Sequence, residues 1–261
     1  MSILESIIKD KRTEVQLRKS LIPPSRLEGF GLFDRPVNSL RKSLQARKTG
    51  IIAEHKRRSP SKAVINQSGS VADIVSGYTR AGAGGISVLT DGKYFGGSLD
   101  DLILARASTE LPLLRKEFII DPYQILEARA YGADAILLIA AVLSKDELHS
   151  LCRTAQSLDL EVLLEVHSRQ ELEFSLEAGA DLIGVNNRNL KTFEVSLDVS
   201  RALCPLIPDS IGKISESGLK TGAELFELKQ LGFEGFLMGE AFMKTSDPGS
   251  ALVDFLKKME A

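Results

Sequence analysis

The chain has 261 residues, of which 43% are hydrophobic, enough to bury a large core. Its 33 Lys and Arg nearly balance its 35 Asp and Glu, and the formal net charge of -2 leaves no global basic field that would favour nucleic acid or an anionic membrane. We therefore expect a local site to hold any anionic ligand.

The sequence lacks the patterns of a membrane segment, a signal peptide or a metal site. Its longest strictly apolar run, at 135–143, is too short to span a bilayer, and MSILESIIKDK has no basic segment followed by an apolar one. Cys152 and Cys204 show no CxxC spacing, and the three histidines show no ligand pairing. We expect a soluble, cytoplasmic protein with no metal, no cofactor and no disulfide scaffold.

Residues 1–48 precede the repeating part of the chain. Apolar residues recur at helical spacing in ILESIIKDKRTEV, an irregular stretch with Pro and Gly follows, and LRKSLQARK predicts a second helix. We expect a helical extension that packs on the following domain. Two roles are open for it: covering apolar surface, and sharing in an active site.

Residues 49–261 predict one catalytic domain of eight β/α units. Phrases such as AGAGGISVL and EAGADLIGV join a helix end to the next strand through Gly and small residues, and SDPGSALVDFLKKMEA supplies a closing helix. The sequence therefore predicts an α/β fold, a single (β/α)8 TIM barrel with an N-terminal helical extension. Its β-rich runs lie at 51–55, 85–89, 112–118, 134–139, 161–166, 182–186, 211–215 and 235–239.

Four of the expected strands end in charged residues, at positions that are normally apolar in a parallel sheet. They are Glu54 and Lys56, Lys116, Glu165, and Glu216. Side chains two apart share a face of a strand, so each charge lies beyond an inward apolar residue, and Asn186 ends the sixth strand in the same way. Active sites of such barrels lie at the carboxyl-terminal ends of the strands, so we expect these groups to converge on one mouth.

Two interpretations of this cluster are open. The charges could be buried ion pairs that hold the barrel together, Glu54 with Lys56 for example. Charges on four strands, all at the same end, favour an active site, and this argument is weakest for Glu216 alone. Burial should lower the pKa of Lys116 and neighbouring carboxylates should raise it, a balance that the sequence leaves open.

Glycine-containing loops after the seventh and eighth strands predict a phosphate site. The sequences ESG at 216–218 and MGE at 238–240 let an anion approach backbone N–H groups, in the two loops where barrels commonly bind phosphate. The loop RRSPSKAVI adds Ser59, Ser61 and Lys62 as polar groups. We expect a small phosphorylated molecule as the ligand.

The chain contains, in this order, IIAEHKRRSPSK, SVLTDGKYFGGS, LLRKEFIID, LLEVH, IGVNNRNL, SESG and FLMGEAFM. This set resembles the indole-3-glycerol phosphate synthase family of tryptophan biosynthesis over nearly the whole chain, and ILESIIKDKRTEV resembles that family's extra helix. Two positions depart from the family pattern: His55, where an apolar or small residue is usual, and Ala63, where SPSKG is usual. Neither departure removes a charged group from the mouth.

The resemblance implies that 1-(2-carboxyphenylamino)-1-deoxyribulose 5-phosphate closes to an indole, losing carbon dioxide and water, without a cofactor. It implies Lys116 as the acid at the ketone oxygen, with Glu165 and Lys56 as base and acid in the dehydration. Lys56 would also bind the substrate carboxylate, with Glu54 and Asn186 orienting it.

The resemblance further implies contacts along the rest of the substrate. Those near the reacting atoms are Arg188, Glu216 and Ser217, and those at the phosphate are Gly218, Gly239, Glu240, Ser59 and Ser61. Some family members have Ser at position 240, so we expect the backbone of Glu240 to make the contact. By position, an apolar wall for the anthranilate ring is expected from Pro60, Phe95, Phe118, Leu138 and Leu237.

Three other functions are open from the residues. A lysine beside a carboxylate at a strand end also suits a Schiff-base aldolase, and a phosphoribosyl isomerase would share the barrel and the phosphate loops. A catalytically silent binding protein is the third. In every case we expect no nucleic acid or membrane partner and a monomer or weak homodimer.

Overall fold

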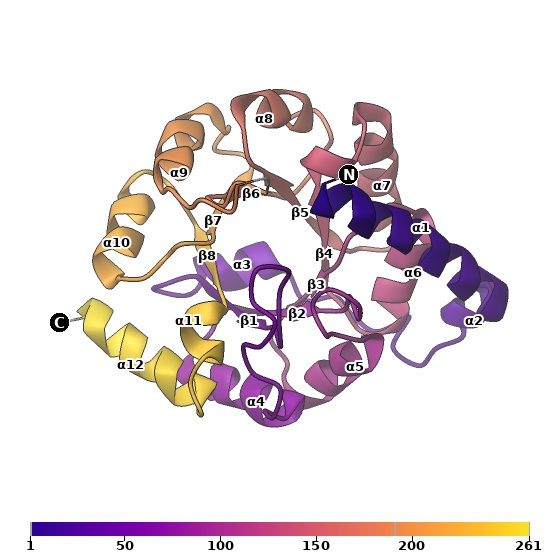
Figure 1. The fold of residues 1–261 in the computed structure, drawn as a ribbon, viewed down its shortest axis with the longest axis horizontal. Coiled ribbons are helices and arrows are strands. Elements are labelled where there is room, and N and C mark those ends of the chain that lie inside the picture. Colours follow the sequence, from indigo (N-terminus) through magenta and orange to yellow (C-terminus); the bar gives the residue numbers. More distant parts are fainter. Residues whose placement is uncertain (1, 191, 261) are drawn as a thin grey trace.

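The computed structural model describes residues 2–190 and 192–260, and its eight parallel strands close into a barrel (Figure 1). Each strand pairs with the next along the chain, and β1 pairs with β8. This confirms the predicted (β/α)8 barrel. The strands are β1 (Ile51–His55), β2 (Gly85–Leu89), β3 (Leu113–Lys116), β4 (Ala135–Ile139), β5 (Glu161–Val166), β6 (Leu182–Asn186), β7 (Gly212–Glu216) and β8 (Gly235–Met238).

Helices surround the barrel, and several begin at the polar caps that helix N-termini prefer. Ser144 and Glu147 form a capping box at the start of α7, and Ser168 accepts from the Glu171 N–H at the start of α8. The outer helices are α4 (Val71–Ala81), α5 (Leu99–Ser108), α6 (Pro122–Ala130), α7 (Lys145–Ser157), α8 (Arg169–Ser175), α9 (Asp198–Leu203), α10 (Gly222–Gln230), α11 (Glu240–Met243) and α12 (Pro248–Glu260), with 3₁₀ turns η1 (Ala140–Val142) and η2 (Cys204–Leu206).

The strands separate two apolar layers. Inward-facing residues such as Ile52, Leu163 and Ile214 fill the barrel interior, whereas Val162 and Leu164 pack against the outer helices. Both faces of a parallel sheet are thus buried, which is why the strands are so rich in Val, Ile and Leu. The alternation also turns the charged strand ends toward the barrel axis.

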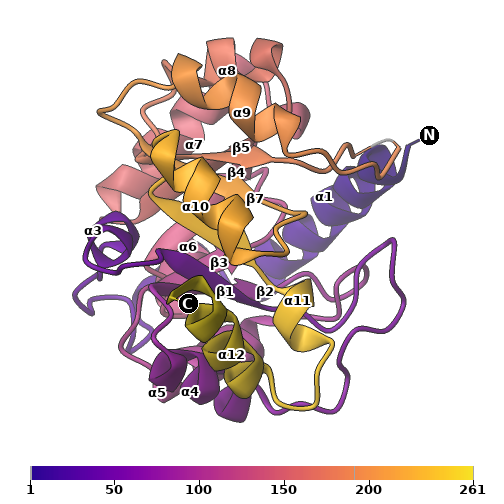
Figure 2. The same cartoon turned by 90° about the vertical axis from the view of Figure 1, so that its left-hand side faces the viewer.

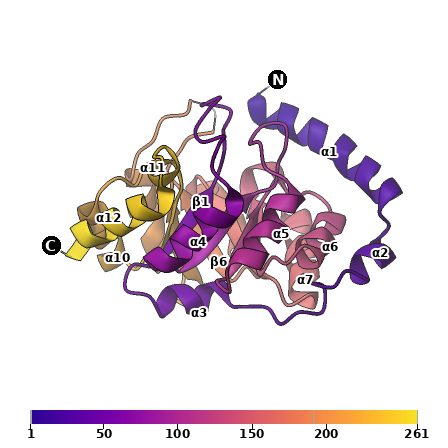
Figure 3. The same cartoon turned by 90° about the horizontal axis from the view of Figure 1, so that it is seen from below.

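The segment before β1 covers both ends of the barrel. Leu40 and Leu44 of α3 (Leu40–Gln45) are buried among the inward-facing strand residues and close the amino-terminal end. Helix α1 (Ile3–Leu21) lies at the opposite end, beside the loops that follow the strands, and α2 (Pro24–Glu28) follows it (Figures 2 and 3). None of the described helices is long and apolar enough to cross a bilayer.

A buried ion-pair cluster ties α1 to the barrel mouth. Lys11 is only 2% exposed, and its Nζ lies 3.0 Å from Asp91 Oδ2 and 3.1 Å from Glu117 Oε1. Removing one partner of such a cluster leaves uncompensated buried charge, so the contact fixes where α1 lies. The extension therefore packs on the barrel at the end where the charged strand residues converge.

Candidate active site

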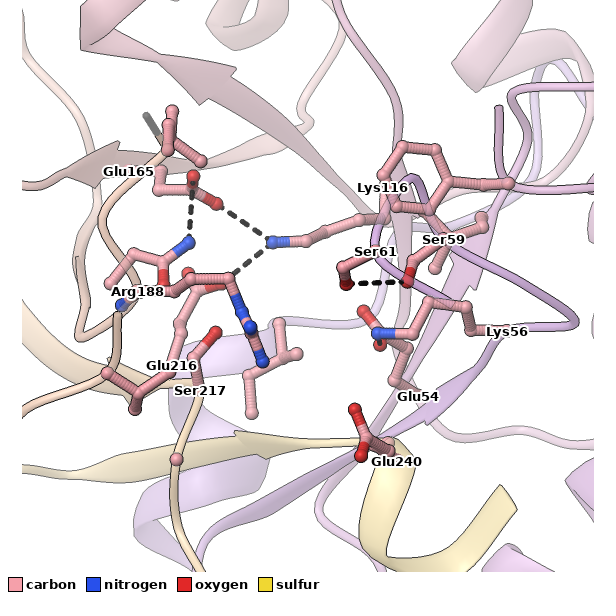
Figure 4. A pocket seen from close by; sticks show the side chains of 18 of the residues that line it. Glu54, Lys56, Ser59, Ser61, Lys116, Glu165, Arg188, Glu216, Ser217 and Glu240 are labelled. Atoms are coloured by element: carbon pink, nitrogen blue, oxygen red, sulfur yellow. Dashed lines mark hydrogen bonds and ion pairs between the residues drawn. The ribbon is translucent and has the colours of Figure 1, made fainter. Parts of the chain in front are cut away.

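A cavity of about 760 Å³ opens at the carboxyl-terminal ends of the strands. Strand ends, the loop after β1 and the loops after β6, β7 and β8 line it, together with Ile3, Leu4 and Ile7 of α1. The close view in Figure 4 shows Lys116 reaching between side chains of different strands. Seventeen predicted residues line the cavity: Glu54, Lys56, Ser59, Pro60, Ser61, Phe95, Lys116, Phe118, Glu165, Asn186, Arg188, Glu216, Ser217, Gly218, Leu237, Gly239 and Glu240.

Lys116 bridges two carboxylates on the cavity floor. Its Nζ lies 2.9 Å from Glu165 Oε2 and 2.7 Å from Glu216 Oε2, and its side chain is 12% exposed (Figure 4). Burial alone lowers the pKa of this lysine, but the negative charges of Glu165 and Glu216 outweigh it and raise the pKa above its ordinary value. Lys116 is therefore held as an ammonium group.

Glu165 is surrounded by donors. Besides Lys116, the Asn186 side-chain amide donates to its Oε1 over 3.1 Å, and His167 Nε2 lies 3.2 Å from the same oxygen. Burial by itself raises the pKa of Glu165, but Lys116 and then His167 lower it well below the usual range. Glu165 is thus a carboxylate held in a fixed direction.

Glu216 has the opposite electrostatic environment. It is 1% exposed, and no described residue donates to its Oε1. Burial raises its pKa, Lys116 opposes this, and the nearby negative charge of Glu165 adds to it, for a value of about 7. A Cβ on Gly184 would come within 2.3 Å of Glu216 Oε1, so the bare backbone of β6 makes room for the carboxylate.

A second lysine–carboxylate pair comes from β1 and the residue beyond it. Lys56 Nζ donates to Glu54, and Glu54 is buried beside the backbone of Gly239, directly after β8. A Cβ at position 239 would lie 2.6 Å from Glu54 Oε1, which explains why glycine follows β8. In Figure 4, Glu54 and Lys56 lie across the cavity from Glu165 and Glu216, so the predicted cluster is assembled from both sides.

The loop after β7 contains two successive residues with positive φ. Ser217 and Gly218 both adopt positive φ, 67° and 78°, and the Asn187 side chain donates to the Ser217 carbonyl over 3.1 Å. Successive N–H groups in such turns form a concave anion-binding surface. A non-glycine residue in this conformation is strained, and strain of this kind gathers at functional sites.

A surface ion pair joins the loop after β1 to the start of α11 at the edge of the cavity. Lys62, in the loop after β1, pairs with Glu240, and this contact lowers the pKa of Glu240 against the effect of burial. Both side chains are about half exposed, so the pair adds little stability. It does bring the loop after β1 to the start of α11.

One predicted wall residue is wrong. Leu138 packs in the outer layer with the helices, whereas Leu137 and Ile139 line the cavity. The register explains this, because Leu137 pairs with Leu163 and Ile139 with Glu165, and both partners face inward. Pro60, Phe95, Phe118 and Leu237 do line the cavity, and the rings of Phe95 and Phe118 pack with centroids 5.9 Å apart.

Two apolar groups stand out among the other lining residues that were not predicted as site residues. The first is the apolar stripe of α1, whose position over the mouth the sequence left open. The second follows β6 and includes Leu190, Phe193 and Val195. Phe193 and Val195 are 39% and 40% exposed, so apolar side chains in a loop were the signal that could have found them.

His55 does not line the cavity. His55 is buried, and burial followed by the charge of Arg57 lowers its pKa to about 4, so it is neutral. Within the described residues, no group of three or more His, Cys, Asp or Glu side chains is placed to hold a metal ion. The polar side chains that line the cavity are lysines, an arginine, carboxylates, an amide and hydroxyl groups.

Sequence comparison links this cavity to one family. The family model described as indole-3-glycerol phosphate synthase matches residues 4–255. A protein of Bacteroides thetaiotaomicron named indole-3-glycerol phosphate synthase is 45% identical over 259 residues, covering 99% of each chain. One from Polaromonas sp. with the same name is 46% identical over 254 residues, covering 96% of each.

Comparison with solved structures shows the same barrel in more distant proteins. A 3-hexulose-6-phosphate synthase from Salmonella typhimurium aligns with a TM-score of 0.63 at 12% identity, over 81% of this chain and 98% of that one. A thiamine phosphate pyrophosphorylase from Pyrococcus furiosus aligns with a TM-score of 0.62 at 17% identity, over 85% and 98%. At such identities the likeness concerns the fold alone.

Proposed function

The chain belongs to the indole-3-glycerol phosphate synthase family, and we propose that Lys116 is the acid that drives ring closure in its cavity. The enzyme is a carboxy-lyase of tryptophan biosynthesis that acts on a small phosphorylated substrate. The observation that carries the proposed role is the Lys116 ammonium, held by Glu165 and Glu216 on the cavity floor.

Ring closure joins the aromatic carbon that bears the carboxylate to the ketone carbon of the substrate chain. As this bond forms, the ketone oxygen takes a proton from Lys116 and becomes a hydroxyl group, and the positive charge rests on the aromatic amine. The Glu165 and Glu216 carboxylates stabilise the ammonium before the transfer. Loss of carbon dioxide then returns the bonding electrons to the ring.

Dehydration completes the indole. The hydroxyl group leaves as water after taking a proton from Lys56, and the pyrroline intermediate loses a proton to Glu165. Lys56 reaches the cavity beside Glu54, so it can also bind the substrate carboxylate before decarboxylation. Asn186 holds Glu165 in direction, and Arg188, Glu216 and Ser217 supply further contacts to the chain of hydroxyl groups.

The phosphate is assigned to the rim formed by the loops after β7 and β8. The backbone N–H groups of Gly218, Gly239 and Glu240 face the anion there, with Ser59 and Ser61 assisting from the loop after β1. Glu240 contributes its backbone, since its carboxylate is engaged with Lys62. The anthranilate ring rests on the apolar wall with Pro60, Phe95, Phe118 and Leu237.

The segment 1–48 is proposed to act as an extension that completes this wall, with residues 49–261 forming the catalytic domain. Ile3, Leu4 and Ile7 line the cavity, which supports a share in substrate binding beyond covering apolar surface. A monomer or weak homodimer is proposed as the working form.

The Schiff-base alternative requires a neutral amine at the strand end. Two carboxylates raise the pKa of Lys116 against the effect of burial, so the nucleophilic form is disfavoured. The discriminating experiment incubates purified protein with 1-(2-carboxyphenylamino)-1-deoxyribulose 5-phosphate and follows indole fluorescence, with borohydride added in a parallel sample. We expect fluorescence to appear and no adduct to be trapped; a trapped adduct without fluorescence would overturn the proposal.

A further inference from the structure

A histidine behind Glu165 is held between two carboxylates. His167 follows β5, its side chain is 11% exposed, and it does not line the cavity. Its Nε2 lies 3.2 Å from Glu165 Oε1, and its Nδ1 is hydrogen-bonded to Glu171 Oε2 over 3.2 Å. Glu171 also accepts the backbone N–H of His167 over 2.7 Å, so the position of the ring is fixed from α8.

Two carboxylates within 3.2 Å of the ring nitrogens favour a charged ring. A neutral imidazole has one N–H group and one lone pair, so it would turn a lone pair toward one of the two carboxylates. An imidazolium carries an N–H group on each nitrogen and a positive charge that both carboxylates attract. Nε2 has no hydrogen-bond partner among the described residues, so its 3.2 Å contact with Glu165 is electrostatic. The geometry therefore places a positive charge directly behind Glu165.

The charged groups around the ring support this state. Glu165 faces it from β5 and Glu171 from α8, and burial, which lowers the pKa of His167, is outweighed by these two carboxylates, which raise it to about 10. Lys116 of β3 and Glu216 of β7 lie on the far side of Glu165. The turn η1 consists of apolar residues only. At the start of α7, Lys145 is paired with Glu177.

We propose that His167 is a positioning residue for Glu165, a second cation that keeps this carboxylate ionised and aimed into the cavity when Lys116 gives up its proton. The proposal rests on the proposed acid role of Lys116. Proton transfer to the ketone oxygen converts Lys116 into a neutral amine, and Glu165 then loses its main electrostatic partner at the step before it must accept a proton. The His167 charge stays in place through that step because it is not consumed.

The first test is the pH dependence of turnover in His167→Gln, in which a neutral amide replaces the imidazolium. Loss of a close positive charge shifts a carboxyl pKa by about one to three units, so the acid limb of kcat should move to higher pH by about one unit or more. Glu171→Gln should move it in the same direction by less. His149→Gln on α7 and Glu173→Gln on α8 are matched controls and should leave the profile unchanged.

A merely structural role would lower kcat by the same factor at every pH and leave the acid limb in place, which would overturn the proposal. The second readout is independent of activity. With three histidines in the chain, the imidazole resonance absent from His167→Gln is that of His167. We expect it to titrate well above neutral pH in the wild type and to titrate lower in Glu165→Gln and Glu171→Gln; titration near the ordinary histidine pKa would overturn the proposal.

The two readouts also separate this proposal from the assignment of function. If the wild-type protein forms no indole, the acid role of Lys116 fails, while the histidine titration still decides whether the imidazolium exists. If the wild type is active and the acid limb does not respond to His167→Gln, only the positioning role fails.

Discussion

The Nζ of Lys116 lies 2.7 Å from Glu216 Oε2, although the two residues are 100 positions apart in the chain. The same ammonium is 2.9 Å from Glu165, so one cation is shared by two carboxylates with opposite pKa shifts. Pairs of titratable groups whose environments separate their pKa values are a common source of acid and base roles.

Replacing Lys116 by Met should remove the acid while preserving the volume and apolar stem of the side chain. We expect turnover, measured by indole fluorescence, to fall by about 10² to 10⁴ because general acid catalysis is lost. Lys213→Met is the matched control: this lysine is also on a barrel strand, but it pairs with the exposed Asp209 and does not line the cavity. Equal losses in both variants would contradict the assignment.

Glu165→Gln and Glu216→Gln should change stability in opposite directions. Glu165 has a lowered pKa, so its ionised form stabilises the fold above pH 4.5 and this stability is lost only in acid. Glu216 has a raised pKa, so its proton stabilises the fold below pH 4.5 and this contribution is lost as the pH rises to about 7.

Thermal unfolding at pH 5 and pH 8 checks these signs. Glu165→Gln should be less stable than the wild type at both pH values. From pH 5 to pH 8, the free energy of unfolding of Glu216→Gln should rise relative to that of the wild type. The expected rise is on the order of 2 kcal/mol, given about 1.4 kcal/mol per pKa unit. If Glu216→Gln loses stability relative to the wild type on going to pH 8, the raised pKa is wrong.

Gly218→Ala should weaken phosphate binding. A Cβ at this position would lie 2.3 Å from Val195 Cγ1, and φ is +78°, so the turn after β7 must shift. We expect KM for the substrate, and the inhibition constant of inorganic phosphate, to rise by roughly tenfold or more, since the loss of charge-assisted contacts costs about 1.5 to 3 kcal/mol. Gly82→Ala provides the control, because Gly82 has φ of +94° with no neighbouring atom within 4 Å.

Both substitutions place alanine at positive φ, but only Gly218→Ala also creates the collision with Val195. The backbone strain should therefore lower stability by about 1 kcal/mol in both variants, while KM changes only in Gly218→Ala. A rise in KM in both would show that general destabilisation, rather than the turn, is responsible.

Leu137→Ala and Leu138→Ala test which face of β4 touches the substrate. Leu137 lines the cavity, so its loss should raise KM by roughly tenfold, as expected for a truncated apolar pocket. Leu138 packs against the helices, and Leu138→Ala should cost about 2 to 5 kcal/mol of stability with KM unchanged. Steady-state kinetics and denaturant unfolding of both variants check the pair, and the reverse pattern would reject the observed register.

Much of the site could be predicted from the sequence because it depends on local patterns. Strand alternation places Lys116 and Glu165 inward beyond Leu114 and Leu163, and the repeated β/α period defines the end of the barrel at which they meet. Each of these inferences needs only residues close together in the chain. The same holds for the Ser144 and Ser168 helix caps.

The remaining features depend on contacts between distant segments. The run AILLIAAVL is apolar on every position, so it carries no alternation, and only pairing with β5 determines that Leu137 rather than Leu138 faces the cavity. Likewise the sequence could not predict which of Glu165 and Glu216 has the higher pKa. Burial and partners that are distant in the sequence, such as Lys116, determine both pKa values. Backbone periodicity is encoded locally, whereas strand register and electrostatic environment exist only once the barrel has closed.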